Sequence, residues 1–361
     1  MRLMVCAGAT GGGVYPALAV LQALGADVDE VLWVGSEDGM EAELVAKAGI
    51  RFHPIPAAGV HGVGLAALPG NLWKLLKGVF AARKVIKDYK PDLLFFTGGY
   101  VAIPTGLAGR KAPTLLYVPD IEPGLALKLV ARFANRIAVT AEDSRSYFSR
   151  KAPVAVTGYP TRTEFMDINR ENAFQTFDLS PDLPTLLVFG GSKGARSINR
   201  ALAAILASLL TEMQIVHITG TRTWPEMKTV QSDLPAELAA RYRAYPYLHE
   251  EMGAALSIAD LVVSRAGASA LGEYPLFGLP AVLVPYPHAW RYQKINAEYL
   301  VKRGAAVVLK DEELEDGLLA TVQGLMKSLK RREAMGSAMR KIARPNAGKR
   351  IAEMLIGLAQ G

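Results

Sequence analysis

Short apolar runs alternate with longer amphipathic segments along the chain, which is the pattern of a parallel α/β sheet with connecting helices. In the first half, the pattern predicts strands at 2–7, 30–35, 51–55, 92–97, 114–118, 135–139 and 153–157 and helices near 15–25, 39–49, 71–90, 101–109, 124–133 and 142–149. In the second half, it predicts strands at 185–190, 214–219, 260–264, 280–284 and 305–308 and helices near 195–210, 250–258, 268–276, 291–303 and 313–329. The tail at 346–360 is expected to form a final helix.

Glycine and proline interrupt this alternation at Thr157-Gly158-Tyr159-Pro160-Thr161, just before it begins a second time. We therefore expect two α/β domains, 1–158 and 159–361; the pattern alone does not place the tail helix, which we assign to the second domain. Ligands of open parallel sheets bind outside the carboxyl ends of the strands. Polar loops follow these ends at 8–13, 35–38, 98–100, 119–124, 190–196, 264–269 and 285–292. The sequence thus predicts two parallel sheets whose loops face an interdomain cleft.

Two glycine-rich turns stand in matching places, one opening each half. The turn at 7–13 reads Ala-Gly-Ala-Thr-Gly-Gly-Gly, and the turn at 190–196 reads Gly-Gly-Ser-Lys-Gly-Ala-Arg. Each lies between a predicted strand and a predicted helix. Glycine lets the backbone approach a ligand closely, and the N-terminus of a helix favours negative charge. The pair indicates two domains of the nucleotide-binding type.

Composition narrows the possible partners. The chain has 361 residues, 50% of them hydrophobic, and a formal net charge of +7, which favours acidic partners such as phosphates or anionic lipid. Nucleic acid is disfavoured because no basic–aromatic binding signature is present. Cys6 is the single cysteine, so no internal disulfide can form, which fits a reducing cytosol. No signal peptide and no apolar stretch of ~20 residues is visible, so we expect any membrane contact to be peripheral.

Longer motifs run through nearly the whole sequence. They are ATGGGVYPALAV at 9–20, MEAELV at 40–45, KPD at 90–92, GGYV at 98–101, GYPTRTE at 158–164, GGSKGARSIN at 190–199, SRAGASALGE at 264–273 and GLPAVLVPYPH at 278–288, with Gln293 and Asn296-Ala297. With these motifs the chain resembles the MurG family of glycosyltransferases. That family transfers GlcNAc from UDP-GlcNAc to undecaprenyl-pyrophosphoryl-MurNAc-pentapeptide in peptidoglycan biosynthesis.

The resemblance implies a GT-B fold of two Rossmann-like domains, with the donor nucleotide held mainly by the second domain and the lipid acceptor by the first. It also implies an inverting reaction that forms a β-1,4 linkage without a cofactor or an active-site metal. We expect the protein to act at the cytoplasmic face of the cell membrane, which it would contact peripherally.

On the donor side, the resemblance assigns the diphosphate to Ser192 and the backbone of Gly190 and Gly191. A hydroxyl and free N–H groups at a helix start suit phosphate oxygens. Glu273 would accept hydrogen bonds from the ribose, Arg162 would contact the nucleotide and Gln293 the sugar hydroxyls. Arg265 could pair either with Glu273 or with phosphate. The full substrate-binding segment is Ala268, Ser269, Ala270, Leu271, Gly272 and Glu273.

On the acceptor side, the resemblance assigns Thr10, Gly11, Gly12 and Gly13 to the turn that faces the acceptor pyrophosphate and the donor sugar, and Tyr100 to the acceptor groove. Tyr100 could equally be an aromatic at the edge of the core. The chain departs from the family at two places. Gly13 stands where the family usually has a histidine, and Tyr117-Val118-Pro119-Asp120 stands where it commonly reads His-Glu-Gln-Asn.

These departures leave the catalytic base open, although an inverting transfer profits from a carboxylate or imidazole near the incoming hydroxyl. Asp120, Glu122 and His61 are the candidates. The two acids could instead cap the helix that follows, and His61 could be an ordinary loop residue.

Two further segments bear on function. Asp27-Val28-Asp29 resembles a metal-binding DxD motif, but it precedes a strand and so belongs at the amino end of the sheet, away from the expected site. The segment 71–90 reads as a basic amphipathic helix, with aromatics at the border between its apolar and cationic faces. We expect Trp73, Lys74, Lys77 and Phe80 to touch an anionic membrane surface, while packing of the same helix on the sheet accounts for its apolar stripe.

Three other functions remain open at this point. One is a related GT-B enzyme with another UDP-sugar or another lipid acceptor. Another is a non-catalytic homologue that binds nucleotide sugar but lost its base at Gly13. The third is a nicotinamide-dependent dehydrogenase, for which Glu37 would hold the ribose, but that function leaves the second glycine turn without a role.

Overall fold

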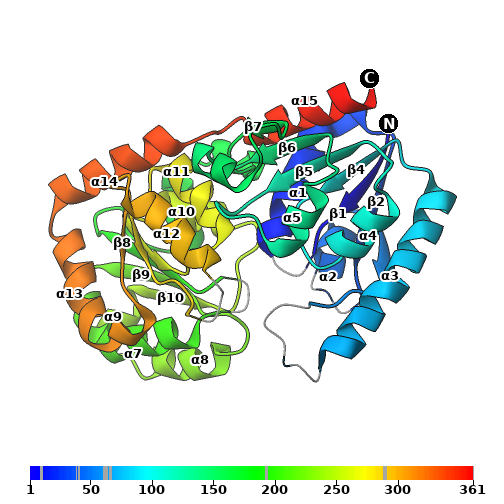
Figure 1. Ribbon diagram of the computed structural model, residues 1–361. Coiled ribbons are helices and arrows are strands. Elements are labelled where there is room, and N and C mark those ends of the chain that lie inside the picture. The colour runs from blue at the N-terminus through cyan, green and yellow to red at the C-terminus, as the bar shows by residue number, and fades with distance from the viewer. Residues whose placement is uncertain are drawn as a thin grey trace. The chain divides into compact units, whose positions relative to one another are not determined.

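The computed structural model describes residues 1–8, 11–37, 39, 41–59, 64, 67–191, 194–287 and 291–360. They form two compact units (Figure 1): unit 1 comprises Met1–Thr163 with Pro345–Gly361, and unit 2 comprises Glu164–Arg344. Each unit is a parallel sheet with helices, so the predicted α/β class is confirmed.

Unit 1 is built on a seven-stranded sheet of order β3-β2-β1-β4-β5-β6-β7. Its strands are β1 (Arg2–Cys6), β2 (Glu30–Ser36), β3 (Arg51–Ile55), β4 (Leu93–Phe96), β5 (Thr114–Val118), β6 (Arg136–Val139) and β7 (Val154–Val156). Every residue of β4 and β5 is buried, as expected for parallel strands covered by helices on both faces. The helices are α1 (Gly11–Leu24), α2 (Glu41–Lys47), α3 (Leu68–Tyr89), α4 (Ala102–Ala108), α5 (Leu125–Val130) and α15 (Ala347–Ala359).

Unit 2 repeats the plan with a six-stranded sheet of order β10-β9-β8-β11-β12-β13. Its strands are β8 (Thr185–Phe189), β9 (Gln214–Ile218), β10 (Tyr242–Tyr245), β11 (Leu261–Ser264), β12 (Ala281–Leu283) and β13 (Ala306–Val308). The helices are α6 (Arg170–Phe177), α7 (Arg196–Leu210), α8 (Trp224–Ser232), α9 (Ala236–Ala239), α10 (Met252–Ile258), α11 (Glu273–Phe277), α12 (Tyr292–Val301), α13 (Leu314–Met326) and α14 (Leu329–Ile342). In both units the order reverses beside the first strand, so the first glycine turn of each lies at a topological switch point.

Several elements differ from the sequence-based expectation. The pattern did not predict β10, α6, α8, α9 or α14. In α14 the buried residues are Met335, Gly336 and Met339, too few to give a clear apolar period. The helix expected at 142–149 is a 3₁₀ segment at Glu142–Tyr147, and the one at 268–276 is divided into a 3₁₀ turn at Ala268–Leu271 and α11.

The tail helix α15 belongs to unit 1, whereas the sequence placed it with the second domain. Its buried residues include Ile351 and Leu355, and it packs along α1 (Figure 1). A Cβ at Gly348 would lie 3.4 Å from the carbonyl of Ala19, so the small residue lets the two helices approach closely. The first boundary between units also lies after Thr163 rather than at 158.

Candidate functional site

In unit 2, the turn between β8 and α7 is closed too tightly to hold side chains at its glycines. A Cβ at Gly190 would lie 2.1 Å from the Ala195 nitrogen, and one at Gly194 would lie 2.3 Å from the Thr219 carbonyl. Gly191 and Gly194 adopt φ of +83° and +73°, which favours glycine. No side chain in the described part of the turn caps α7, and its first turn carries no acidic residue. Its amide groups therefore remain available to an anion.

A buried polar network supports α7 from below. His217 on β9 contacts Tyr242 OH with Nδ1 at 2.7 Å and Asn199 Oδ1 with Nε2 at 3.0 Å. The amide nitrogen of Asn199 then donates to the Thr219 carbonyl at 2.7 Å and to Thr223 Oγ1 at 2.6 Å. Burial lowers the pKa of His217 to about 3, so the imidazole is neutral at physiological pH.

Arg265 follows β11 and forms a salt bridge with Asp311. From the sequence, Glu273 and phosphate were its two possible partners, and the salt bridge is not with Glu273. Its guanidinium also donates to Ser197 Oγ at 2.8 Å and to the Val284 carbonyl at 3.1 Å. Asp311 and Ser197 were not singled out in the sequence, because the three residues are far apart along the chain.

The remaining donor-side candidates lie in the segments that follow β11 and β12, up to the first turns of α11 and α12. Ala268, Ala270 and Leu271 are buried, whereas Ser269, Gly272 and Glu273 are half-buried. Glu273 is the first residue of α11, and the adjacent Tyr274 bonds to Ser264 Oγ at 2.6 Å. Gln293 accepts a hydrogen bond from the Tyr286 backbone N–H at 2.8 Å. That bond orients the side-chain amide so that its NH₂ group can donate elsewhere.

In unit 1, the first glycine turn packs backbone against backbone with the turn after β4. Thr97 Oγ1 donates to the Gly13 carbonyl at 2.6 Å, and a Cβ at Gly99 would lie 2.9 Å from the Gly8 carbonyl carbon. A Cβ at Gly13 would lie 3.3 Å from the Thr97 carbonyl oxygen. A larger residue at position 13 would thus need a small shift of one backbone segment. Gly11 and Gly12 begin α1 beside it.

A buried carboxylate next to this turn was not recognised in the sequence. Glu41 is fully buried and accepts hydrogen bonds from the Ser36 N–H and hydroxyl, both at 2.8 Å. A Cβ at Gly8 would lie 2.4 Å from its Oε1. The glutamate therefore fills the space beneath Gly8 and ties the turn to the end of β2. Glu41 is part of the motif MEAELV, but its place beneath the turn depends on a tertiary contact that consecutive residues do not reveal.

The two acidic base candidates after β5 have different surroundings. Glu122 is 1% exposed and its Oε1 lies 3.0 Å from Lys128 Nζ, whereas Asp120 is half-buried. Thr140 Oγ1 donates to the Pro119 carbonyl at 2.8 Å and so fixes the loop that carries both acids. Asp120 is therefore the more accessible of the two carboxylates.

Two further candidates lie on unit 1. Tyr100 is 45% exposed, and its ring lies so close to Gly59 that a Cβ there would be 2.6 Å from Cζ. Arg162 belongs to unit 1 rather than to the second domain, and its guanidinium stacks 5.4 Å from the centre of the Tyr15 ring. Thr10, His61 and Ser192 lie outside the described residues.

The DxD-like segment lies where the sequence placed it, before β2. Asp29 pairs with the amino group of Met1, at the amino end of the strands. Among the residues that the structure describes, no three His, Cys, Asp or Glu side chains form a cluster suited to a metal ion.

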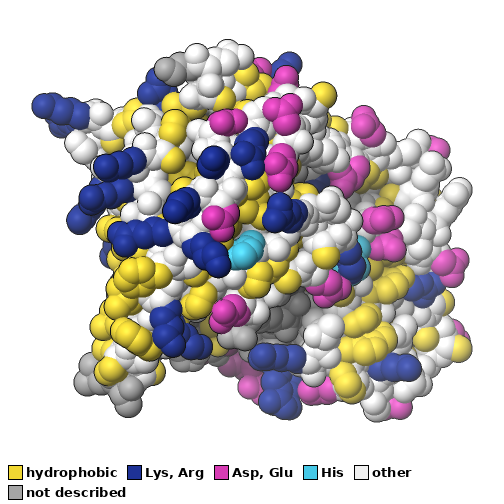
Figure 2. Space-filling model, turned by 90° about the vertical axis from the view of Figure 1, so that its right-hand side faces the viewer, with side chains coloured by type: hydrophobic (Ala, Val, Ile, Leu, Met, Phe, Trp, Pro, Cys, Tyr) yellow, Lys and Arg dark blue, Asp and Glu magenta, His cyan; other side chains and the backbone are white. Residues whose placement is uncertain are grey.

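The helix α3 exposes apolar and cationic side chains together. Trp73 is 58% and Phe80 60% exposed, with Leu72 and Leu76 also exposed, and Lys77 Nζ lies 5.5 Å from the Trp73 ring centre. Figure 2 views the face that carries α3 and shows Lys and Arg side chains beside hydrophobic ones. None of the described helices has the length and apolar composition needed to cross a bilayer.

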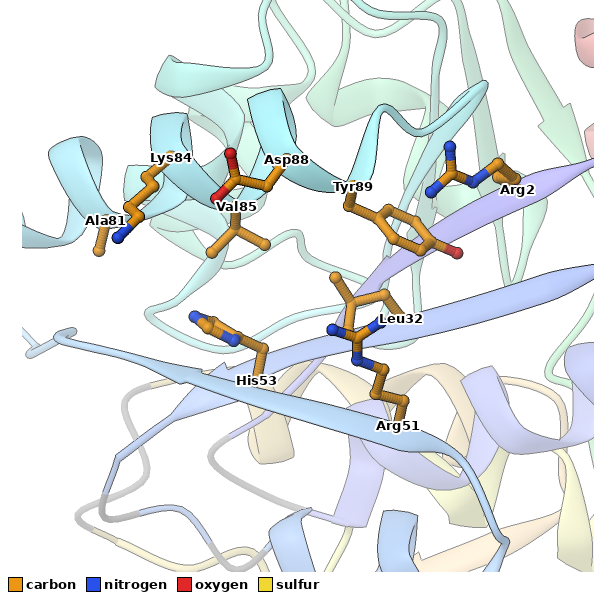
Figure 3. Close-up of a pocket in the computed structure, with 9 residues that line it drawn as sticks. All are labelled: Arg2, Leu32, Arg51, His53, Ala81, Lys84, Val85, Asp88 and Tyr89. Carbon is orange, nitrogen blue, oxygen red and sulfur yellow. The ribbon is translucent and has the colours of Figure 1, made fainter.

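A hollow of about 300 Å³ lies between the second half of α3 and the sheet of unit 1 (Figure 3). Figure 3 shows Lys84 reaching down from α3 and His53 and Arg51 pointing up from β3. The other residues that line the hollow include Arg2, Asp88 and Tyr89. Arg2 and Arg51 begin their strands, so this basic hollow lies toward the amino ends and not at the loops described above.

Comparison with known proteins identifies the fold and the family. Residues 3–139 match the Glycosyltransferase family 28 N-terminal domain and residues 185–351 its C-terminal domain. A protein of Roseiflexus sp. named UDP-N-acetylglucosamine--N-acetylmuramyl-(pentapeptide) pyrophosphoryl-undecaprenol N-acetylglucosamine transferase is 41% identical, over 98% of this chain and 94% of its own length. The protein of that name from Halothermothrix orenii is 35% identical over 100% of both chains. The chain belongs to the MurG family.

Solved structures agree with this assignment. The crystal structure of Acinetobacter baumannii MurG superposes with a TM-score of 0.75 at 29% identity, covering 98% of this chain and 99% of that one. Units 1 and 2 are therefore the two domains of a GT-B fold, and the chain is a glycosyltransferase of the MurG family.

Proposed function

We propose that this chain transfers GlcNAc from UDP-GlcNAc to undecaprenyl-pyrophosphoryl-MurNAc-pentapeptide, the step that turns lipid I into lipid II in peptidoglycan synthesis. The observation that carries the proposal is the 41% identity, over 98% of the chain, to the Roseiflexus protein whose name states this reaction. The geometry of each unit supports it independently.

On the donor side, we assign the diphosphate to the β8–α7 turn with Ser192 and the backbone of Gly191. The start of α7, which no described side chain caps, and the absence of side chains at Gly190 and Gly194 support the assignment, because phosphate oxygens can approach the backbone amides. Glu273 would accept from the ribose and Gln293 would donate to the sugar hydroxyls. Arg162 would contact the nucleotide.

In the reaction, the acceptor hydroxyl oxygen bonds to the anomeric carbon of GlcNAc while the bond from that carbon to UDP breaks. UDP leaves with the electron pair of that bond, and the configuration inverts. A base takes the proton of the incoming hydroxyl, which typically accelerates such a step by ~10²–10⁴. We assign this role to Asp120, because its carboxylate is half-buried while that of Glu122 faces Lys128.

Fixed donors aimed at the leaving diphosphate would stabilise the charge that develops there. We propose that they do so without an active-site metal, as the family resemblance implies. Turnover that survives EDTA unchanged would support this part of the proposal, and loss of turnover restored by a divalent cation would overturn it.

The acceptor carries a lipid, so the enzyme must reach a membrane surface. We propose that α3 provides the contact at the cytoplasmic face, with Trp73 and Phe80 at the level of the head groups and Lys74 and Lys77 against anionic lipid. Their joint exposure supports this, since aromatic and cationic side chains are favoured at that interface.

The decisive experiment incubates the purified chain with UDP-GlcNAc and lipid I and identifies the product by mass spectrometry. We expect a product heavier by one N-acetylhexosamine and release of UDP. Product formed only with another UDP-sugar, or only with an acceptor such as diacylglycerol, would favour a related GT-B enzyme. UDP binding without turnover on any acceptor would favour the non-catalytic homologue. A rise in the thermal stability of the chain with NAD but not with UDP would favour the dehydrogenase.

A further inference from the structure

Arg265 connects four loops of unit 2 through one guanidinium. It follows β11 itself, pairs with Asp311 after β13, donates to Ser197 Oγ at 2.8 Å at the start of α7, and donates to the Val284 carbonyl at 3.1 Å after β12. Its guanidinium carbon also lies 5.1 Å from the ring centre of Tyr286. All four loops lie at the carboxyl ends of their strands, where a ligand of this sheet would bind.

The three polar side chains close a ring of hydrogen bonds. Ser197 Oγ accepts from Arg265 Nη2 and donates to Asp311 Oδ1, each at 2.8 Å, and the same Oδ1 accepts from Arg265 Nη1. The side chain of Arg265 is 9% exposed and that of Asp311 is 22% exposed. A charged, largely buried ring with matched donors and acceptors holds its members in one geometry.

Ser197 is the second residue of α7, directly after the glycine turn. The described part of the turn contains three glycines, Gly190, Gly191 and Gly194, and α7 has no side-chain cap among the described residues. Glycine has more accessible backbone conformations than any other residue, so contacts beyond the turn help to hold this backbone in one conformation. Tethering Ser197 to Asp311 and Arg265 fixes the first turn of α7, and with it the direction of the free amide groups.

We infer that Asp311 and Ser197 are positioning residues for the donor diphosphate, acting through Arg265 and the start of α7. This inference rests on the proposed function, because it concerns the same donor site. The ring sets where the amides of the first turn of α7 point, and so it governs affinity for the diphosphate and stabilisation of the leaving group. It makes no contribution to recognition of the uridine.

The test compares UDP with uridine as ligands of Ser197→Ala and Asp311→Asn in the full chain, by calorimetry. In both variants the hydrogen-bond donors to the diphosphate would point in the wrong direction, so we expect UDP to bind about 10-fold or more weakly. Affinity for uridine should stay unchanged. Donor KM should rise or kcat fall while the acceptor KM does not change.

Glu312→Gln is the matched control for Asp311→Asn, because it removes the same charge from the neighbouring, exposed position. Thermal unfolding of each variant separates loss of fold from loss of positioning. Arg265→Lys keeps the charge but not the planar fork, and it should resemble Asp311→Asn.

Equal loss of UDP and uridine affinity would overturn the inference, as would unchanged UDP affinity in both variants. Tighter UDP binding by Asp311→Asn would also overturn it, since it would show that Arg265, once released, is itself the phosphate ligand. Failure of the wild-type chain to bind UDP would instead contradict the proposed function.

Discussion

The carboxylate of Glu122 lies 3.0 Å from the ammonium group of Lys128, with the acid buried and the lysine partly exposed. A buried carboxylate without such a partner is costly, and one that is held by it is poorly placed to take a proton from an incoming hydroxyl. The pair thus separates the two acids of this loop into a structural one and a candidate base.

Replacing Glu122 with Gln should lower the free energy of unfolding while leaving catalysis largely intact. Loss of a hydrogen bond between charged groups typically removes ~1–3 kcal/mol, and urea unfolding measures it. Lys128→Met should show a loss in the same direction. A large fall in kcat without any change in stability would contradict this assignment and return Glu122 to the list of bases.

Replacing Asp120 with Asn should have the opposite profile. We expect kcat to fall by ~10²–10⁴, the usual contribution of a general base, with UDP affinity and stability close to those of the wild type. Steady-state turnover with lipid I and calorimetry with UDP give the two quantities. A variant that turns over at the wild-type rate would exclude Asp120.

Gln293 offers a way to separate loop tethering from sugar recognition. Gln293→Glu keeps the oxygen that accepts from the Tyr286 N–H but loses the NH₂ donor, whereas Gln293→Ala loses both. If the donor group contacts a sugar hydroxyl, both variants should raise the KM for UDP-GlcNAc by about 10-fold or more, equivalent to ~1–3 kcal/mol. Affinity for UDP, which lacks the sugar, should not change. A KM for UDP-GlcNAc that is the same in Gln293→Glu as in the wild type would contradict the assignment.

His217 should make stability depend on pH. Its pKa is about 3 in the folded chain, against 6.5 as its ordinary value, so the unfolded state binds more protons between these two values. Stability is therefore fully present above pH 6.5 and is lost as the pH falls toward 3. Between pH 7.5 and 5.0 the loss from this group is about 2 kcal/mol.

Urea unfolding at the two pH values measures this loss. In His217→Gln, the part of the pH-dependent loss of unfolding free energy that comes from His217 should disappear, even though the variant is less stable than the wild type at pH 7.5. The variant His249→Gln, at an exposed position, should keep the pH dependence of the wild type. An identical slope in wild type and His217→Gln would contradict the prediction.

The exposed face of α3 should bind membranes through two separable contributions. Lys74→Gln with Lys77→Gln should weaken co-sedimentation with anionic vesicles, by ~1 kcal/mol per lysine, and should have little effect on neutral ones. Trp73→Ala with Phe80→Ala should weaken binding to both. Lys228→Gln with Lys341→Gln, which removes two exposed lysines from unit 2, is the control. Binding that ignores lipid charge and survives loss of the α3 lysines would contradict the proposal.

Periodicity was enough to predict most of the two sheets, because their strands are short, apolar and separated by amphipathic helices. It failed for β10, where Arg243 interrupts the apolar run and bonds to the Phe177 carbonyl at 2.8 Å. It also failed for the place of α15, because which surface a helix covers depends on tertiary packing and not on its own period. Gly348 shows this: its lack of a side chain matters only because Ala19 lies opposite.

The candidate site divides in the same way. Motifs with local meaning, such as the glycine turns and the segment 264–273 that ends at Glu273, can be recognised from consecutive residues. The ring of Ser197, Arg265 and Asp311 cannot, because its members are separated by 46 to 114 positions in the chain. The same holds for Glu41 beneath Gly8, since a buried glutamate and an exposed one look alike in a helix-forming segment.

Because α15 covers α1, the polypeptide crosses between the two units twice, once after Thr163 and once after Arg344. A fragment ending at Thr163 would expose to solvent the apolar surface of α1 that α15 buries, and it should aggregate. Joining residues 345–360 to that fragment through a flexible linker would bury this surface again. Unit 2 is thus inserted within unit 1, and a label on either terminus of the protein reports on the same half of the molecule.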